Sequence, residues 1–251
     1  MAQETLILVG RDSAAAVGRE HADRLRERGI VDTVRSVTYE AEPTLELEET
    51  LSALPGDRVY AVPTCFAHTH ETLTAVPRAL RHVPGDVRYC APLGKAPAIT
   101  RAIRERARDA SDADALLLVA LGNSRDDHAR DAAAFHAARL RDEFAEVKAA
   151  YLLQSPAVEC ARYALDADHA VACPLFLAEC DATRGDVPAR LELDRGGIDY
   201  AGPLGAHPAV TDAVAAAVER ERVLAESETG SSGTDLVANA RRVVTDGRGD
   251  G

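Results

Sequence analysis

The sequence predicts an α/β fold made of two similar halves, each a mainly parallel sheet flanked by helices, with a cleft between them. Whole phrases recur at a constant offset, and short apolar segments alternate with amphipathic ones. The apolar segments are also nearly continuous, which is typical of parallel strands that helices cover on both faces. These three observations together favour a duplicated, layered α/β protein.

The repeat is clearest where RYCAPLGKAPAIT, at 88–100, returns as DYAGPLGAHPAVT at 199–211, an offset of 111 residues. PTCFAHTHETLTAVPRAL, at 63–80, returns as PLFLAECDATRGDVPARL at 174–191. Two copies are too few, and each is too long, for a solenoid. We therefore expect a tandem duplication followed by a polar tail that cannot form a core. The expected parts are an N-terminal half over 1–110, a C-terminal half over 111–225 and a flexible tail over 226–251.

Each copy predicts the same order of elements. A first strand enters a Gly/Ser/Asp loop and an amphipathic helix, and then a second strand, a second helix and a third and fourth strand follow. The last helix begins at a proline, which suits a first helical turn. The expected strands are 6–9, 33–39, 57–63 and 86–94, then 116–121, 146–153, 169–177 and 197–205, and the second helices are 44–54 and 156–165. The apolar positions of the first helices are Ala15, Ala22 and Leu25, and Ala134, Ala138 and Leu140.

Charge and composition argue against several classes of partner. The chain of 251 residues has 41 Asp and Glu against 29 Lys and Arg, and a net charge of −12 disfavours nucleic acid and anionic membranes. The acidic, alanine-rich balance with only two lysines is typical of a halophilic protein. Five cysteines without a C-x-x-C pair fit a reducing cytoplasm. No apolar run approaches the ~18 residues that span a bilayer, so we expect a soluble, unsecreted protein.

Common nucleotide and hydrolase motifs are missing. Neither first strand leads into G-x-G-x-x-G, and Gly94 and Lys95 lack the rest of a phosphate-binding loop. Ser13 and Ser124 follow first strands, but neither stands in G-x-S-x-G, so a hydrolase is a weak hypothesis. Ligands of parallel sheets bind at the carboxyl ends of the strands, and this places the candidate site in the loops after the first and third strands.

The loop after the third strand of the first copy holds Cys65, His68, His70 and Glu71. Residues two apart in an extended segment point the same way, so His68 and His70 can present both imidazoles to one ion. Glu71 or Cys65 would then be a further ligand or a base, and this donor set suits Co, Fe, Ni or Zn. The alternative is that His68 caps the next helix, His70 is solvated and Cys65 is a small buried apolar residue.

Other histidines are weaker candidates. His21 and His136 stand at equivalent places on the two first helices, which indicates structural duplication, and His207 is a possible cleft residue. In the second copy, the positions of His68, His70 and Glu71 are taken by Glu179, Asp181 and Ala182, in that order. If both loops face one cleft, the acidic loop of the second copy would adjust the charge of the cleft or accept protons.

The duplication and its phrases resemble the class II tetrapyrrole chelatases, in particular the sirohydrochlorin cobaltochelatase and ferrochelatase family. LLLVALGNSRD is similar to the family's strand ending in Gly-His-Gly-Ser-Arg-Asp, PLFL opens a similar stretch with a second proline, and PLGAHP is similar to Pro-Leu-Gly-x-His-Pro. The resemblance covers about residues 5–225. It implies two chelatase-like halves with sirohydrochlorin between them. It further implies ATP-independent insertion of Co²⁺ or Fe²⁺ for cobalamin or siroheme synthesis, with no cofactor beyond that substrate metal.

The family's two catalytic histidines are absent from their usual positions. The first falls on Arg11 and Gly122 in the two copies, and the second falls on Glu71 and Ala182. Since metal insertion needs a ligand for the ion and a base for the pyrrole protons, we predict a relocated site. Its metal ligands are His68, His70 and Glu71, and its catalytic residues are His70 and Glu71.

Arginines of the cleft are predicted to hold the carboxylates of the macrocycle, because a strongly acidic protein needs local positive charge for a polycarboxylate. The predicted substrate-binding residues are Arg11, Ser13, Gly122, Asn123, Ser124 and Arg125. Two alternatives stay open. One is a non-catalytic paralogue that binds tetrapyrrole or metal, which the loss of the family histidines supports, and the other is a binding module without a link to tetrapyrroles.

Overall fold

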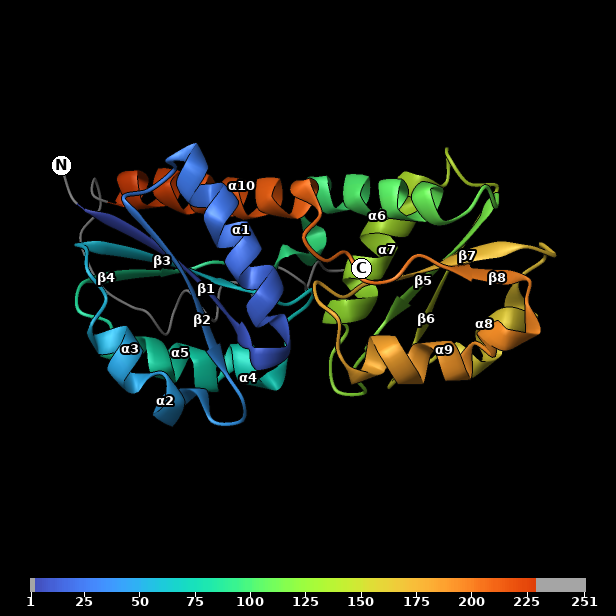
Figure 1. Cartoon of the computed structure of the whole chain (residues 1–251), viewed down its shortest axis with the longest axis horizontal. Coiled ribbons are helices and arrows are strands. Elements are labelled where there is room, and N and C mark those ends of the chain that lie inside the picture. Colours follow the sequence, from blue (N-terminus) through green and yellow to red (C-terminus); the bar gives the residue numbers. More distant parts are fainter. Residues whose placement is uncertain (1–2, 229–251) are drawn as a thin grey trace, which may run out of the picture.

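The computed structural model of the chain describes residues 3–228, which form two four-stranded parallel sheets flanked by helices (Figure 1). The sheets have the same strand order, β2-β1-β3-β4 and β6-β5-β7-β8. The strands are β1 (Glu4–Arg11), β2 (Thr33–Tyr39), β3 (Arg58–Pro63) and β4 (Asp86–Tyr89), then β5 (Ala115–Ala120), β6 (Glu146–Tyr151), β7 (Ala170–Pro174) and β8 (Ile198–Tyr200). The predicted fold class and the duplication are confirmed.

The helices follow the predicted order with some differences in length. The long helices are α1 (Ala15–Arg28), α6 (Pro97–Ala110), α7 (His128–Leu140) and α10 (Pro208–Glu228). The short helices are α2 (Pro43–Glu46), α3 (Glu48–Ser52), α4 (His70–Leu73), α5 (Ala75–Ala79), α8 (Val158–Ala164) and α9 (Val187–Arg190). Short 3₁₀ turns cover Asp12–Ala14, Leu80–His82, Leu93–Lys95 and Leu193–Arg195, and Ala182–Asp186 is a π-helical turn.

The buried face of α7 differs from the predicted one. Ala134 and Ala138 are exposed, whereas Ala133, His136 and Ala137 are buried. The prediction failed because this helix carries alanine on several of its faces, so that its sequence shows little contrast between the buried and the exposed face. On α1 the predicted Ala22 and Leu25 are buried.

The last helix of each half covers the sheet of the other half (Figure 1). Helix α10 packs on β3 and α1, while α6 packs on β7 and β8. Arg222 of α10 pairs with Glu4 of β1 at 2.6 Å, and Arg106 of α6 donates to the Ala201 carbonyl oxygen at 2.7 Å. One hydrophobic core therefore runs through both halves, and a separate smaller core lies on the outer face of each sheet.

Two buried histidines join the halves in the same way. In each case Nδ1 lies 2.8 Å from a threonine hydroxyl, and Nε2 lies 3.2 Å or 2.6 Å from a glycine carbonyl oxygen. Because a carbonyl oxygen only accepts, Nε2 carries the proton and Nδ1 accepts from the threonine. The sets are His21 with Thr211 and Gly205, and His136 with Thr100 and Gly94. The prediction of structural duplication at these histidines is confirmed.

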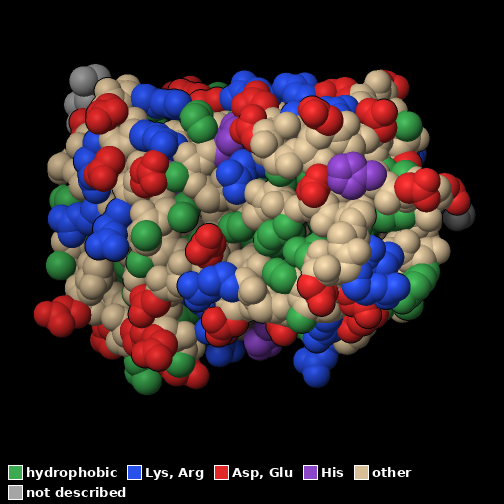
Figure 2. Space-filling model, turned by 45° about the vertical axis from the view of Figure 1, so that its right-hand side comes forward, with side chains coloured by type: hydrophobic (Ala, Val, Ile, Leu, Met, Phe, Trp, Pro, Cys, Tyr) green, Lys and Arg blue, Asp and Glu red, His purple; other side chains and the backbone are tan. Residues whose placement is uncertain are grey.

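Helix α10 continues to Glu228, three residues into the predicted flexible tail, and the rest of that prediction, 229–251, lies outside the described residues. No helix within residues 3–228 combines the length and the apolar character needed to span a bilayer. Acidic and basic side chains are intermixed over the face in Figure 2. Among the described residues, many acidic and basic side chains form surface ion pairs, such as Arg190 with Glu159 at 3.1 Å.

Candidate functional site

The carboxyl ends of both sheets point toward the middle of the molecule (Figure 1). The loops after β1 and β3 of the first half therefore lie near the loops after β5 and β7 of the second half. This arrangement gathers the segments that carry the predicted site residues, as expected for parallel sheets.

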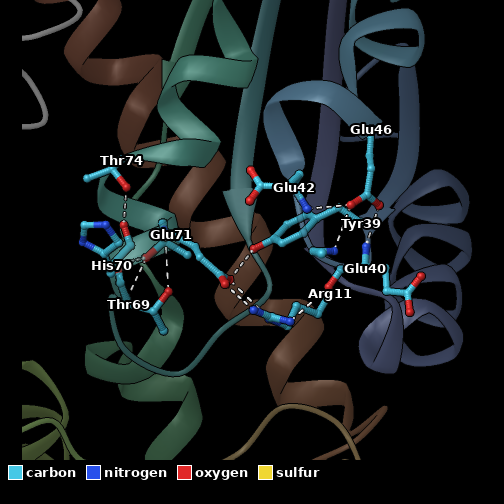
Figure 3. A network of polar contacts seen from close by, with 11 residues as sticks. Arg11, Tyr39, Glu40, Glu42, Glu46, Thr69, His70, Glu71 and Thr74 are labelled. Carbon is cyan, nitrogen blue, oxygen red and sulfur yellow. Dashed lines mark hydrogen bonds and ion pairs between the residues drawn. The ribbon is translucent and has the colours of Figure 1, made fainter.

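Arg11 and Glu71 form an ion pair at the end of the first sheet (Figure 3). Arg11 is the last residue of β1, and its Nε lies 3.2 Å from Oε2 of Glu71, while its Nη2 contacts Oε1. The Tyr39 hydroxyl donates to Oε2 at 3.2 Å. Burial, with a smaller effect of the Glu71 charge, raises the pKa of Tyr39, so this hydroxyl stays a donor at neutral pH. The two positions on which the family resemblance places histidine are thus in direct contact.

His70 lies apart from this pair because it begins α4. Thr69 caps the helix: its hydroxyl accepts from the Thr72 amide at 3.3 Å, and its own amide donates to the Thr72 hydroxyl at 2.8 Å. The segment is therefore turning and not extended, and His70 is exposed and directed away from Glu71 (Figure 3). Across residues 3–228 no three His, Cys, Asp or Glu side chains gather where one metal ion could sit, so His68, His70 and Glu71 do not form the predicted ligand group.

His68 instead faces His128 across the junction of the two halves. Their ring centroids are 5.7 Å apart, with the rings at 64°. His68 lies on the loop after β3, with Nδ1 3.3 Å from the Thr72 hydroxyl and with a buried Nε2 that has no hydrogen-bond partner. Burial, and to a smaller extent His128, lowers the pKa of His68 to about 4, so the imidazole is neutral at pH 7.

His128 is the residue that sequence reasoning missed. It is the first residue of α7, after Asp126 and Asp127, and nothing in its spacing connects it with a loop sixty residues earlier. Only the exchange of elements between the halves brings the two histidines together.

A cavity of about 420 Å³ opens beside this histidine pair. Its walls are mostly alanine, proline, leucine and phenylalanine from the loops after β3 and β4 and from α7 and α10. The polar lining residues are His68, His128, Lys95 and Arg220. Lys95 is held by Asp131 of α7 at 3.3 Å.

A second cavity of about 640 Å³ lies at the equivalent place of the other half. Its polar lining includes Ser13, Glu20, Arg106, Glu179, Arg184 and His207. Glu179 stands where the first half has His68, at the same offset of 111 residues. His207 accepts from the Ala209 amide at 3.2 Å and faces Glu105 at 3.1 Å, so it lines this cavity while it caps the start of α10.

The remaining predicted residues lie at the rim of the second sheet. Gly122 has φ +75°, and a Cβ there would lie 2.9 Å from Tyr151 and Gln154, so the turn after β5 requires glycine. Asn123 shapes that turn, because its Oδ1 accepts from the Arg125 amide at 2.9 Å. Ser124 and Arg125 are exposed.

Cys65 is not placed as a thiolate ligand. Burial raises the pKa of its thiol to about 12, which keeps the group neutral at pH 7. The Cys65 side chain therefore agrees with the alternative of a small apolar residue.

The sequence profile of the CbiX family matches this chain twice, over residues 6–110 and 115–221. The chain belongs to the CbiX family. A relative from Halobacterium salinarum, described as a probable sirohydrochlorin cobaltochelatase, is 26% identical, and the alignment covers 84% of this chain and 89% of the relative. The resemblance to the class II chelatases is thus confirmed.

Solved structures agree with this assignment. A multi-domain protein from Deinococcus radiodurans with structural similarity to chelatases has a TM-score of 0.68 at 26% identity; the match covers 86% of this chain and 54% of the other, so the CbiX-family chain spans about half of that protein. The sirohydrochlorin chelatase SirB from Bacillus subtilis subspecies spizizenii, in complex with cobalt, has a TM-score of 0.69 at 17% identity, with 91% and 98% covered. At that identity the likeness shows the fold.

Proposed function

We propose that this CbiX-family chain is a sirohydrochlorin chelatase that inserts Co²⁺ or Fe²⁺ without ATP, in cobalamin or siroheme synthesis. The similarity to a probable sirohydrochlorin cobaltochelatase supports the substrate and favours cobalt. The sequence has no nucleotide-binding loop, in agreement with an ATP-independent reaction that takes no cofactor beyond the substrate metal. A cytoplasmic location stays a prediction.

The contact between Arg11 and Glu71 carries this proposal. The fold brings together the two positions at which the family resemblance expects catalytic histidines, and this supports the same place for the reaction with different side chains. Glu71 offers a carboxylate as proton acceptor for the pyrrole nitrogens. Arg11 is half-exposed, with 53% of its side chain accessible, and its free N–H groups can bind a substrate carboxylate.

The rim of the second sheet offers a surface for the macrocycle. Leu121 and Leu153 follow β5 and β6, and the Leu153 amide donates to the Leu121 carbonyl oxygen at 2.8 Å. Both side chains are exposed, at 40% and 58%, which suits an apolar ring face. Polar groups at this rim would bind the peripheral carboxylates, and these are Asn123, Ser124 and Arg125. Ser13, which lines the second cavity, would bind a further carboxylate from there.

Metal handling is assigned to the loop after β3. His70 is exposed at the start of α4 and would take the ion from solvent, and His68 lies deeper at the junction of the halves. Imidazole nitrogens are suitable ligands for Co²⁺ and Fe²⁺.

The test is an insertion assay with the purified chain, sirohydrochlorin and Co²⁺ or Fe²⁺, followed by absorbance. We expect a rate above the uncatalysed one, and a lower rate for Glu71→Gln. Glu159→Gln is the matched control, because Glu159 forms an exposed ion pair with Arg190 on the outer layer of the second half. An uncatalysed rate with the unaltered chain would exclude the proposal.

A second candidate is a non-catalytic paralogue that binds tetrapyrrole or metal. Glu71 favours it, because Arg11 and Tyr39 already engage both carboxylate oxygens. Stoichiometric binding of sirohydrochlorin without metal insertion in the same assay would support this function.

A further inference from the structure

We propose that His68 and His128 together bind one divalent transition-metal ion at the junction of the two halves. The binding itself does not depend on the proposed function. That the bound ion is the source of the inserted metal rests on the proposed function.

The geometry of the two rings suits a shared ion. Metal–nitrogen bonds of about 2.0 to 2.1 Å to two imidazoles place the ring centroids roughly 5 to 6 Å apart. The centroids of His68 and His128 are 5.7 Å apart. Nδ1 of His68 lies 3.3 Å from the Thr72 hydroxyl, which can orient the ring as an outer partner does in metal sites.

An unpartnered nitrogen points to a missing ligand. Nε2 of His68 is buried and has no hydrogen-bond partner, whereas both nitrogens of His21 and of His136 are bonded. Buried polar atoms without partners are uncommon, and an ion at this nitrogen would satisfy it. The cavity of about 420 Å³ beside the pair leaves room for the ion and its remaining ligands.

The surrounding charges permit a cation. Lys95 and Arg220 line the same cavity, but both side chains are 57% exposed. Each also has a carboxylate near it, since Asp131 lies 3.3 Å from the Lys95 ammonium and Glu221 lies 3.8 Å from the Arg220 guanidinium. Donors that are all imidazole select Co²⁺, Ni²⁺ or Zn²⁺ over Mg²⁺ and Ca²⁺.

The pair supplies only two protein ligands. Among the described residues no third His, Cys, Asp or Glu joins them, so water or substrate must fill the other positions. Catalytic zinc sites use three protein ligands and structural sites use four. An ion on two imidazoles is therefore held less tightly and exchanges more readily, as a metal in transit to a substrate requires.

The duplication provides an internal comparison. Aligning His21 with His136 puts Ser13 at the place of His128, and the offset of 111 residues puts Glu179 at the place of His68. Both of these residues line the second cavity, which therefore lacks the imidazole pair. We expect one such metal site per chain.

The experiment is a titration of the metal-free chain with Co²⁺ in the absence of tetrapyrrole, read by the visible absorption of bound cobalt. We expect one ion per chain, and an affinity at least roughly tenfold lower for His68→Ala and for His128→Ala. The control is His169→Ala, an exposed histidine of the second half that pairs with Asp199 at 2.9 Å. Thermal unfolding without metal checks that the variants fold, and Co²⁺ should raise the midpoint of the unaltered chain but not of the variants.

Each of the other possible outcomes contradicts one part of the proposal. Unchanged cobalt affinity in both alanine variants excludes the site, and an equal loss in His70→Ala would favour the loop histidines over the pair. Cobalt binding at the pair without insertion into sirohydrochlorin would overturn the proposed function alone. An insertion rate at limiting Co²⁺ that is unchanged in His68→Ala/His128→Ala would overturn the role as metal source.

Discussion

Arg11 and Glu71, separated by 60 residues in the sequence, form an ion pair where the first sheet ends. The resemblance to the chelatases assigns histidine to both positions. Where the resemblance expects two histidines, which can bind a metal ion, this chain has an arginine and a glutamate, which bind each other. Because the two charges pair with each other, neither is left without a partner at this end of the sheet.

Returning histidine to both positions should raise the rate of cobalt insertion. In Arg11→His/Glu71→His the two imidazoles start from side chains already in contact, so they can share an ion or move a proton. We expect an increase of roughly tenfold or more in kcat/KM for sirohydrochlorin, measured by absorbance.

The matched control is Arg190→His/Glu159→His, which alters another Arg–Glu ion pair outside the middle of the molecule. This double variant should leave the rate unchanged. A rate in Arg11→His/Glu71→His no higher than in the unaltered chain would show that the reaction uses another place.

Loss of one histidine between the halves should destabilise the whole chain. In His136→Ala the Thr100 hydroxyl and the Gly94 carbonyl oxygen both lose their partner, and the core loses packing. We expect the free energy of unfolding to fall by roughly 2 to 4 kcal/mol in urea titration. His169→Ala, an exposed substitution, should change it by less than about 0.5 kcal/mol. Equal effects of the two substitutions would contradict a joining role for His136.

Acid should weaken the fold between about pH 6.5 and 4. Burial lowers the pKa of His136 to about 4 and also lowers the pKa of His21. Across that window the unfolded chain binds protons that the folded chain does not, so stability decreases as the pH falls and this loss ends near pH 4. His136 alone accounts for up to roughly 3 kcal/mol. Urea titrations at several pH values give the free energy of unfolding as a function of pH. This free energy should fall less steeply with acid in His136→Gln than in the unaltered chain, and an unchanged slope would exclude this histidine as the cause.

The strands and the duplication could be predicted because each depends on residues that are close together in the sequence or on phrases that recur in it. Residues 33–39 are predicted as a strand and form β2, since most positions of TVRSVTY hold Thr, Val or Tyr, which are frequent in strands. The exchange of α6 and α10 could not be predicted in this way. Both helices have an apolar face, and nothing local states which sheet that face covers.

The site was predicted less well than the fold for the same reason. The loop with His68 was found from its residue types, but Thr69 and Thr72 start a helix there and separate His70 from His68. His128 belongs to the other half, so its partner follows from tertiary packing alone. The spacing of residues along one segment therefore pointed to the loop of His68 but could not show that His128 lies beside it.

Gly94→Ala should disturb the loop that carries His68. A Cβ at Gly94 would lie 2.0 Å from the Phe66 carbonyl oxygen, and this is backbone that moves only with the loop. We expect a loss of roughly 2 to 4 kcal/mol in the free energy of unfolding and a weaker cobalt affinity, because the loop shift separates His68 from His128. The control is Gly185→Ala, where an added Cβ meets nothing within 4 Å and the change should stay within about 0.5 kcal/mol. If Gly94→Ala keeps both the stability and the cobalt affinity of the unaltered chain, close packing of Gly94 on Phe66 does not position the histidine.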